Sequence, residues 1–234
     1  MLQCRSKRFE TMDKQTKKKI NISETAARRY IENNRFTIQS LAKEMDMKSS
    51  EIFELFPNRK SILLYFYESR LQIYKEQTTS IDGYSDFTLS EKLSNLFLSL
   101  LDDFLEFREF VLETYQKFVV QSPFDTMFKK EFKKELKMIF NSDNQISASA
   151  SFFVNSLLYK TIYYHFHALI LFWTNDSSEK FEQSFALVDK WCSLIEEIFY
   201  NKVLDKGFDF GKFLFYNSPF NQAFSNIKSD GGKS

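Results

Sequence analysis

Apolar residues recur at helical intervals through the first quarter of the chain. Residues 16–33 carry them four positions apart, which predicts one amphipathic helix. Two shorter periodic runs follow at residues 38–45 and 49–56. The second of these runs must end at Pro57, and Asn58 can cap a fourth helix. The pattern therefore predicts a head of one longer and two short helices.

The rest of the chain repeats helical periods at greater length. A capping box at residues 88–91 opens a leucine-rich helix, and further helices are expected over 108–121 and 125–140. Residues 147–173 are nearly uncharged, but Lys160 in their middle would be costly in lipid, so they predict a buried helix and no membrane span.

The last long helix carries an apolar seam spaced in steps of four and three. Such a heptad-like repeat favours a helical partner, and it predicts a homodimer contact. The seam consists of Phe181, Phe185, Val188, Cys192, Ile195 and Phe199.

The chain as a whole is predicted to be all-α. Only five glycines and three prolines interrupt 234 residues, too few for the turns of a β-rich protein. We expect about nine helices in four parts: a basic arm at 1–15, the helix-turn-helix head at 16–60, a helical body at 61–206, and an aromatic then polar tail at 207–234.

Charge distinguishes the head from the rest. Residues 1–60 hold fourteen Lys or Arg against eight Asp or Glu, whereas the remaining residues hold eighteen against twenty-three. A basic head on an acidic body favours a polyanionic partner for the head alone.

The polar residues form no pattern typical of catalysis. The sequence has no glycine-rich phosphate loop, nucleophile elbow or metal-ligand cluster, and His165 and His167 are two apart, on different faces of a helix. Cys4 and Cys192 suggest no disulfide framework, and residues 1–5 lack a secretory signal. We therefore expect a cytoplasmic protein that is not an enzyme and uses no cofactor or metal.

One segment of the head resembles a known family. Residues 37–62 read T-I-Q-S-L-A-K-E-M-D-M-K-S-S-E-I-F-E-L-F-P-N-R-K-S-I. This run is similar to the TetR-family head, T-V-x-x-I-A-x-x-A-G-V-S-x-G-T-L-Y-x-H-F-x-S-K-x-x-L, and the similarity covers residues 20–64. The resemblance implies a ligand-responsive transcriptional regulator, usually a repressor, that binds double-stranded operator DNA as a homodimer.

The resemblance also assigns positions. It implies that Thr37 caps the second helix and touches phosphate. The complete set that it places at DNA is Thr37, Lys48, Ser49, Ser50, Phe53, Arg59 and Lys60. Asp46 replaces the usual turn glycine, a position where Asp is tolerated because it adopts left-handed conformations. Glu51 and Glu54 are unexpected, because carboxylates are repelled by phosphates.

For the body, the resemblance implies an effector site whose occupancy alters the spacing of two heads. Apolar residues suited to an apolar or lipid-like small molecule are Leu93, Phe97, Phe104, Phe118, Phe152, Tyr163, Phe166, His167 and Trp173. The run 172–178 also resembles a pattern in lipid-binding proteins of TetR fold. Two alternatives stay open: a lipid carrier of this fold without specific DNA binding, and an interaction module that uses the aromatic tail.

Overall fold

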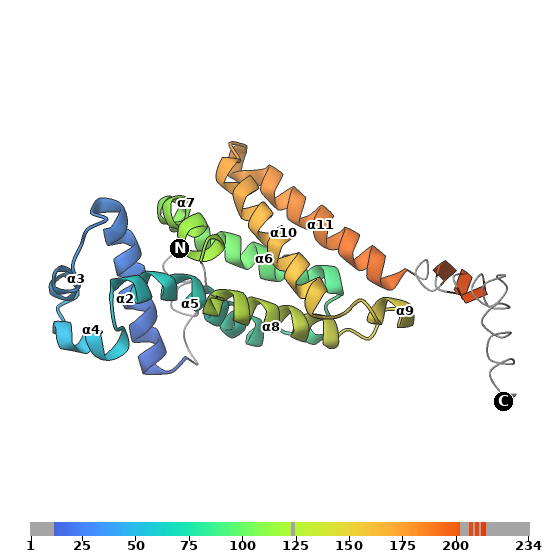
Figure 1. Cartoon of the computed structure of the whole chain (residues 1–234), viewed down its shortest axis with the longest axis horizontal. Helices are drawn as coiled ribbons and strands as arrows, with labels where there is room; N and C mark the ends of the chain where they lie inside the picture. The colour runs from blue at the N-terminus through green and yellow to red at the C-terminus, as the bar shows by residue number, and fades with distance from the viewer. Residues whose placement is uncertain (1–11, 123–124, 202–205, 208, 211, 214–234) are drawn as a thin grey trace, which may run out of the picture.

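The computed structural model describes residues 12–122, 125–201, 206–207, 209–210 and 212–213. Over these residues the chain forms ten α-helices and no strand, in an elongated molecule with a small head at one end (Figure 1). The all-α prediction is confirmed. None of the helices in these ranges is long and apolar enough to cross a membrane. Most of the predicted arm and tail lies outside the described residues.

The head follows the predicted three-helix pattern. Its helices are α2 (Lys14–Glu32), α3 (Ile38–Glu44) and α4 (Ser49–Leu55). Thr37 caps α3 as predicted: its hydroxyl accepts from the Ser40 N–H, and the Ser40 hydroxyl accepts from the Thr37 N–H, both at 3.1 Å. Asp46 adopts a φ of 51° in the turn between α3 and α4, the left-handed conformation expected there.

Helix α5 (Arg59–Thr79) joins the head to the body. The Asn58 side chain accepts from the Ser61 N–H at 2.9 Å, so the helix begins where the sequence predicted. It then continues through residue 61, where the boundary between head and body was predicted. The continuous helix α5 therefore belongs to both parts.

The body contains six further α-helices and three short irregular turns. They are η1 (Tyr84–Asp86), α6 (Leu89–Leu105), α7 (Arg108–Tyr115), the π turn η2 (Gln116–Val120), α8 (Met127–Asn141), α9 (Ala148–Ser151), α10 (Ser156–Asn175), η3 (Glu179–Phe181) and α11 (Glu182–Tyr200). The predicted capping box at the start of α6 is present, with the Glu91 carboxylate accepting from the Thr88 N–H at 2.7 Å. Helices α10 and α11 lie antiparallel to each other (Figure 1).

The single buried helix predicted over 147–173 is wrong. A break separates α9 from α10, because the Asn155 side chain accepts from the Leu157 N–H at 2.9 Å and starts a new helix. Residues 151–153 are exposed, and Phe152 is 74% exposed.

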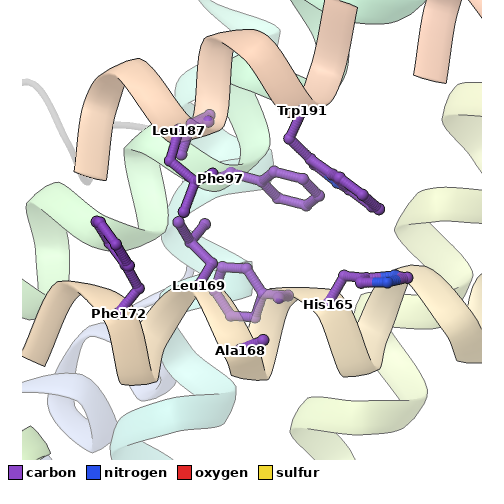
Figure 2. A pocket seen from close by; sticks show the side chains of 9 residues that line it. Phe97, His165, Ala168, Leu169, Phe172, Leu187 and Trp191 are labelled. Carbon is purple, nitrogen blue, oxygen red and sulfur yellow. The ribbon is translucent and has the colours of Figure 1, made fainter. Parts of the chain in front are cut away.

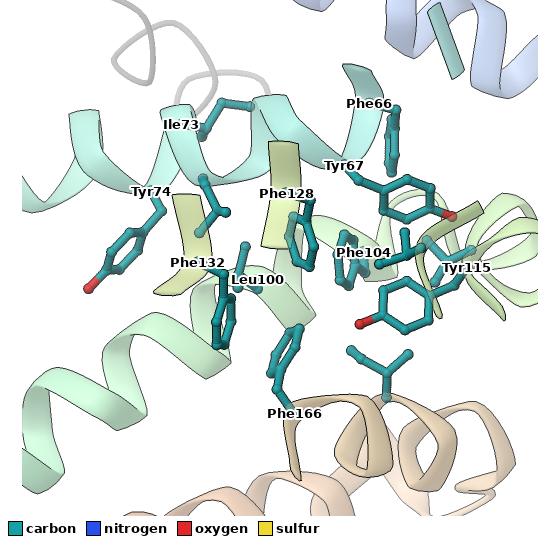
Figure 3. Packing of buried hydrophobic residues seen from close by; sticks show 14 of the residues in the cluster. Phe66, Tyr67, Ile73, Tyr74, Leu100, Phe104, Tyr115, Phe128, Phe132 and Phe166 are labelled. Atoms are coloured by element: carbon teal, nitrogen blue, oxygen red, sulfur yellow. The ribbon is translucent and has the colours of Figure 1, made fainter. Parts of the chain in front are cut away.

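Aromatic rings fill the interior of the body (Figure 3). Phe132 of α8 lies 4.8 Å from Phe166 of α10, measured between ring centroids, and Phe97 of α6 stacks parallel to Phe132 at 6.2 Å. Phe66 of α5 and Phe104 of α6 extend the cluster toward the head. Each fully buried ring contributes roughly 1.5–3 kcal/mol of transfer free energy, so this cluster accounts for much of the chain's high phenylalanine content.

Candidate functional site

The short helix α4 lies at the outer end of the head (Figure 1). Lys48 and Ser50 are exposed, Ser49 is half-buried, and Phe53 is 48% exposed although its neighbour Ile52 is fully buried. Thr37 is also exposed, at the start of α3. A helix of this size with a polar outer face fits the major groove of DNA, whose width is about 12 Å.

The acidic residue Glu51 has a local role in this helix. Its carboxylate accepts from the Lys18 ammonium at 2.7 Å and from the Lys48 N–H at 3.2 Å. The hydrogen bond from Lys18 is the main cause that holds the pKa of Glu51 below its usual value. Glu51 therefore caps α4 and has its charge balanced by Lys18, which reduces the repulsion expected from the sequence. Glu54 remains an exposed acid on this helix.

Arg59 is hydrogen-bonded to the loop that precedes Thr37. One guanidinium nitrogen, Nη1, donates to the carbonyl oxygens of Asn34 at 2.8 Å and Phe36 at 3.1 Å, and the guanidinium carbon lies 5.3 Å from the Phe36 ring centroid. These contacts fix the loop between α2 and α3. Lys60, the next residue, is exposed.

The body contains an apolar pocket of about 280 Å³ between α10 and α11, with Phe97 of α6 on its inner side (Figure 2). Phe172 and Leu187 lie at one end of the pocket, and His165 and Trp191 lie at the other. The remaining lining is Phe166, Ala168, Leu169 and Val188.

Two polar groups are available in this apolar lining. The Trp191 indole Nε1 is buried and has no hydrogen-bond partner within the described part of the chain. The His165 ring lies beside it, at 4.3 Å between centroids. An apolar cavity with one unsatisfied donor suits an apolar molecule that carries a hydrogen-bond acceptor.

The residues that the sequence assigned to the effector do not lie in one place. Of that predicted set, only Phe97 and Phe166 line the pocket between α10 and α11. Leu93, Phe104, Tyr163, His167 and Trp173 are buried in the packed core, because neighbouring rings occupy the space between them. Phe118 lies at the junction of head and body, and Phe152 is mostly exposed and does not line this pocket, so its contact with an effector stays a prediction.

His167 does not line the pocket, and its imidazole is hydrogen-bonded to a neighbouring phenol. Its Nδ1 lies 2.6 Å from the Tyr115 hydroxyl. Burial lowers the pKa of His167 to about 4 and raises that of Tyr115 well above its usual value. At neutral pH the imidazole is therefore uncharged and Tyr115 is protonated, and the tautomer of His167 decides which of the two groups donates.

This buried imidazole predicts an acid-sensitive stability. Between the ordinary pKa of 6.5 and about 4, the unfolded chain binds a proton at His167 that the folded chain does not, so the free energy of unfolding falls as the pH is lowered. At pH 5 the expected loss is about 2 kcal/mol. Urea denaturation between pH 7 and pH 5 measures it: His167→Gln should lose less stability over this range than the native chain. The control His165→Gln changes an exposed histidine of the same helix and should keep the full loss.

The predicted dimer seam of the last helix faces its own chain. Val188 and Cys192 have no exposed surface, Ile195 and Phe199 are nearly as buried, and α11 packs along α6. Phe181 and Phe185 are partly buried against the same core. Contact with a partner subunit is therefore wrong for the four buried residues, because α6 of the same chain covers them. For Phe181 and Phe185 it stays a prediction.

Other apolar residues of α10 and α11 are exposed. On α10 they recur at seven-residue steps, as Leu157, Tyr164 and Leu171; on α11 they are Leu187, Leu194 and Ile198. Their exposed fractions range from 37% to 68%. Two adjacent helices with an exposed apolar stripe of this kind are typical of a helical interface.

Comparison with known proteins places the body in a family. The family model described as "Tetracyclin repressor-like, C-terminal domain" matches residues 92–214, slightly more than half of the chain. Among solved structures, the chain is similar to the TetR transcriptional regulator from Nitrosomonas europaea, with a TM-score of 0.52 and 14% identity. The match covers 74% of this chain and 94% of that one. No curated protein matches the sequence.

Proposed function

The chain belongs to the tetracycline-repressor-like (TetR) family of transcriptional regulators, and on this basis we propose that it is a ligand-responsive repressor. It binds a palindromic operator as a homodimer. The observation that carries the proposal is the arrangement of α3 and α4, with Asp46 in a left-handed conformation between them and Lys48 and Ser50 exposed at the start of α4. This is a helix-turn-helix geometry in which the second helix reads base edges.

The exposed stripes of α10 and α11 support the homodimer. In a twofold dimer the same surface is used by both copies, so α10 and α11 would meet their counterparts in a four-helix contact. The heads would then be held at one separation. Because half-sites lie about one helical turn of DNA apart, that separation decides whether both heads bind.

The pocket between α10 and α11 supports an apolar effector. Phe172 and Leu187 line this pocket and are themselves exposed on the face of the proposed dimer. A ligand that spreads α10 from α11 would therefore change the dimer contact and the separation of the heads. The Trp191 Nε1, which has no hydrogen-bond partner among the described residues, favours an apolar molecule with a hydrogen-bond acceptor.

Substitution at the start of α4 tests operator recognition. Ser50→Asp places a carboxylate where the proposal puts a base edge and the adjacent phosphates. Specific affinity is expected to fall about a hundredfold or more. A lost base contact costs about 1–3 kcal/mol, and charge repulsion adds to that cost. Fluorescence anisotropy with genomic fragments measures this affinity, and circular dichroism checks that the helix content is unchanged.

Ser85→Asp is the matched control, because Ser85 is an exposed serine far along the sequence from the head. It should leave DNA affinity unchanged. The native protein should prefer one palindromic fragment and lose affinity steeply with salt. Equal binding to every fragment, or none at moderate salt, would contradict the repressor and favour a lipid carrier of the same fold.

A further inference from the structure

A cationic pocket lies where the head meets the body. Four basic residues line this cavity of about 340 Å³, which we call the junction pocket. Arg35 follows α2, Arg59 and Lys60 begin α5, and Lys117 comes from the π turn after α7. Head, connecting helix and body therefore each contribute positive charge to one concave surface.

Among the described residues, no acidic side chain lines the junction pocket. Within the described part of the chain, none of the four basic residues forms a salt bridge. Three basic residues of α2 contrast with them, because Lys18, Arg28 and Arg29 each pair with a glutamate. Four like charges around a cavity repel one another, and a bound anion would relieve that repulsion.

One of the donors is held in a fixed orientation. Nη1 of Arg59 bonds the carbonyl oxygens of Asn34 and Phe36, which holds the guanidinium plane at the rim of the pocket. A planar guanidinium that is already oriented matches the oxygen atoms of a phosphate, to which arginine donates two parallel hydrogen bonds.

The remaining lining adds aromatic surface and an unusual backbone. Tyr30 and Phe118 meet edge to face, with 6.4 Å between ring centroids. Lys117 and Phe118 belong to a π turn, a conformation that is rare and frequently found at functional sites. Aromatic rings beside basic groups are the surroundings in which nucleotide-like molecules bind. The volume also falls within the range of small-molecule sites.

We propose that the junction pocket is a binding site for a phosphate group, supplied by a small organic phosphate or by the DNA backbone. The bound phosphate contacts Arg59 and Lys60 at the start of α5 and Lys117 of the body. Occupancy therefore ties the head to the body and restricts the angle between them. This coupling would act in addition to the effector pocket between α10 and α11.

Nuclear magnetic resonance titration of the full-length protein tests the free-phosphate source. Inorganic phosphate and adenosine 5′-monophosphate serve as probes, against chloride at equal ionic strength, and the Arg35 and Arg59 side-chain N–H signals are followed. Lys117→Gln should weaken binding about tenfold, the loss expected for one charge-assisted hydrogen bond. Lys137→Gln, which removes one exposed charge from α8, should bind as the native chain does.

Binding of a DNA backbone phosphate would change different measured quantities. If backbone phosphate occupies the junction pocket, Lys117→Gln should weaken binding to all fragments equally. The dependence of log affinity on log salt should also become shallower by about one unit. Neither effect is expected when only a free organic phosphate binds there. The titration with free probes needs no DNA, so its result does not depend on the proposed repressor function.

The proposal fails if the native protein binds neither probe and Lys117→Gln leaves the salt dependence of DNA binding unchanged. It also fails if Lys117→Gln and Lys60→Gln bind the probes as tightly as Lys137→Gln does while DNA binding is unaltered. Either result would mean that the four basic residues form only an ordinary charged surface.

Discussion

Replacing Arg70 with leucine is expected to lower the free energy of unfolding by about 3–5 kcal/mol. Arg70 of α5 donates to the Glu24 carboxylate of α2 at 2.8 Å, and the two side chains are only 2% and 11% exposed. Ser69 accepts a second bond from the guanidinium, which also lies over the Phe66 ring. Leucine would leave the Glu24 carboxylate buried without its main counter-charge, and that desolvation causes the loss.

Urea denaturation measures the free energy of unfolding of Arg70→Leu and Arg28→Leu, and so compares the loss of a buried ion pair with the loss of an exposed one. Arg28 also pairs with a glutamate, Glu106, at 2.7 Å, but these side chains are 45% and 37% exposed. The exposed pair should contribute less than about 1 kcal/mol. A double variant, Glu24→Leu with Arg70→Leu, should recover much of the stability, since no unpaired charge remains. Equal effects of the two single variants would contradict this account.

The Glu24–Arg70 pair also shows which features the sequence could predict. The starts of α3, α5 and α6 were predicted correctly, because the Thr37, Asn58 and Thr88 side chains each accept from a backbone N–H only three residues away. The left-handed conformation of Asp46 was also predictable from a local property, because Asp tolerates this conformation better than most residues. Glu24 and Arg70 lie 46 positions apart, and no local pattern indicates that they meet.

The same distinction explains the errors in the body. The seam through Val188 and Cys192 has the repeat of a helical interface, but a repeat does not specify whether the partner helix belongs to the same chain. Here it is α6. The break before α10 had a signal, since Asn155 is a good cap, but the apolar residues around it concealed that signal. The pocket between α10 and α11 depends on how far two helices stand apart, which periodicity does not report.

Leu171→Lys combined with Leu194→Lys is expected to convert the proposed dimer into monomers. The two leucines are 48% and 52% exposed on α10 and α11, in the stripes that a second copy would cover. Twofold symmetry makes each change occur twice, so four leucine contacts are lost, at about 1.5–3 kcal/mol each. The total of about 6 kcal/mol or more corresponds to at least a ten-thousandfold weaker dimer. Analytical ultracentrifugation measures the change.

A matched pair of substitutions distinguishes the interface from a general effect of charge. Leu112→Lys with Met138→Lys also places two lysines at exposed apolar positions, 41% and 53% exposed, but on α7 and α8. This variant should remain dimeric. Loss of the dimer should also lower operator affinity, because a single head contacts only one half-site. If the first variant stays dimeric, the interface lies elsewhere, and the effector pocket beside Phe172 and Leu187 would lose its route to the heads.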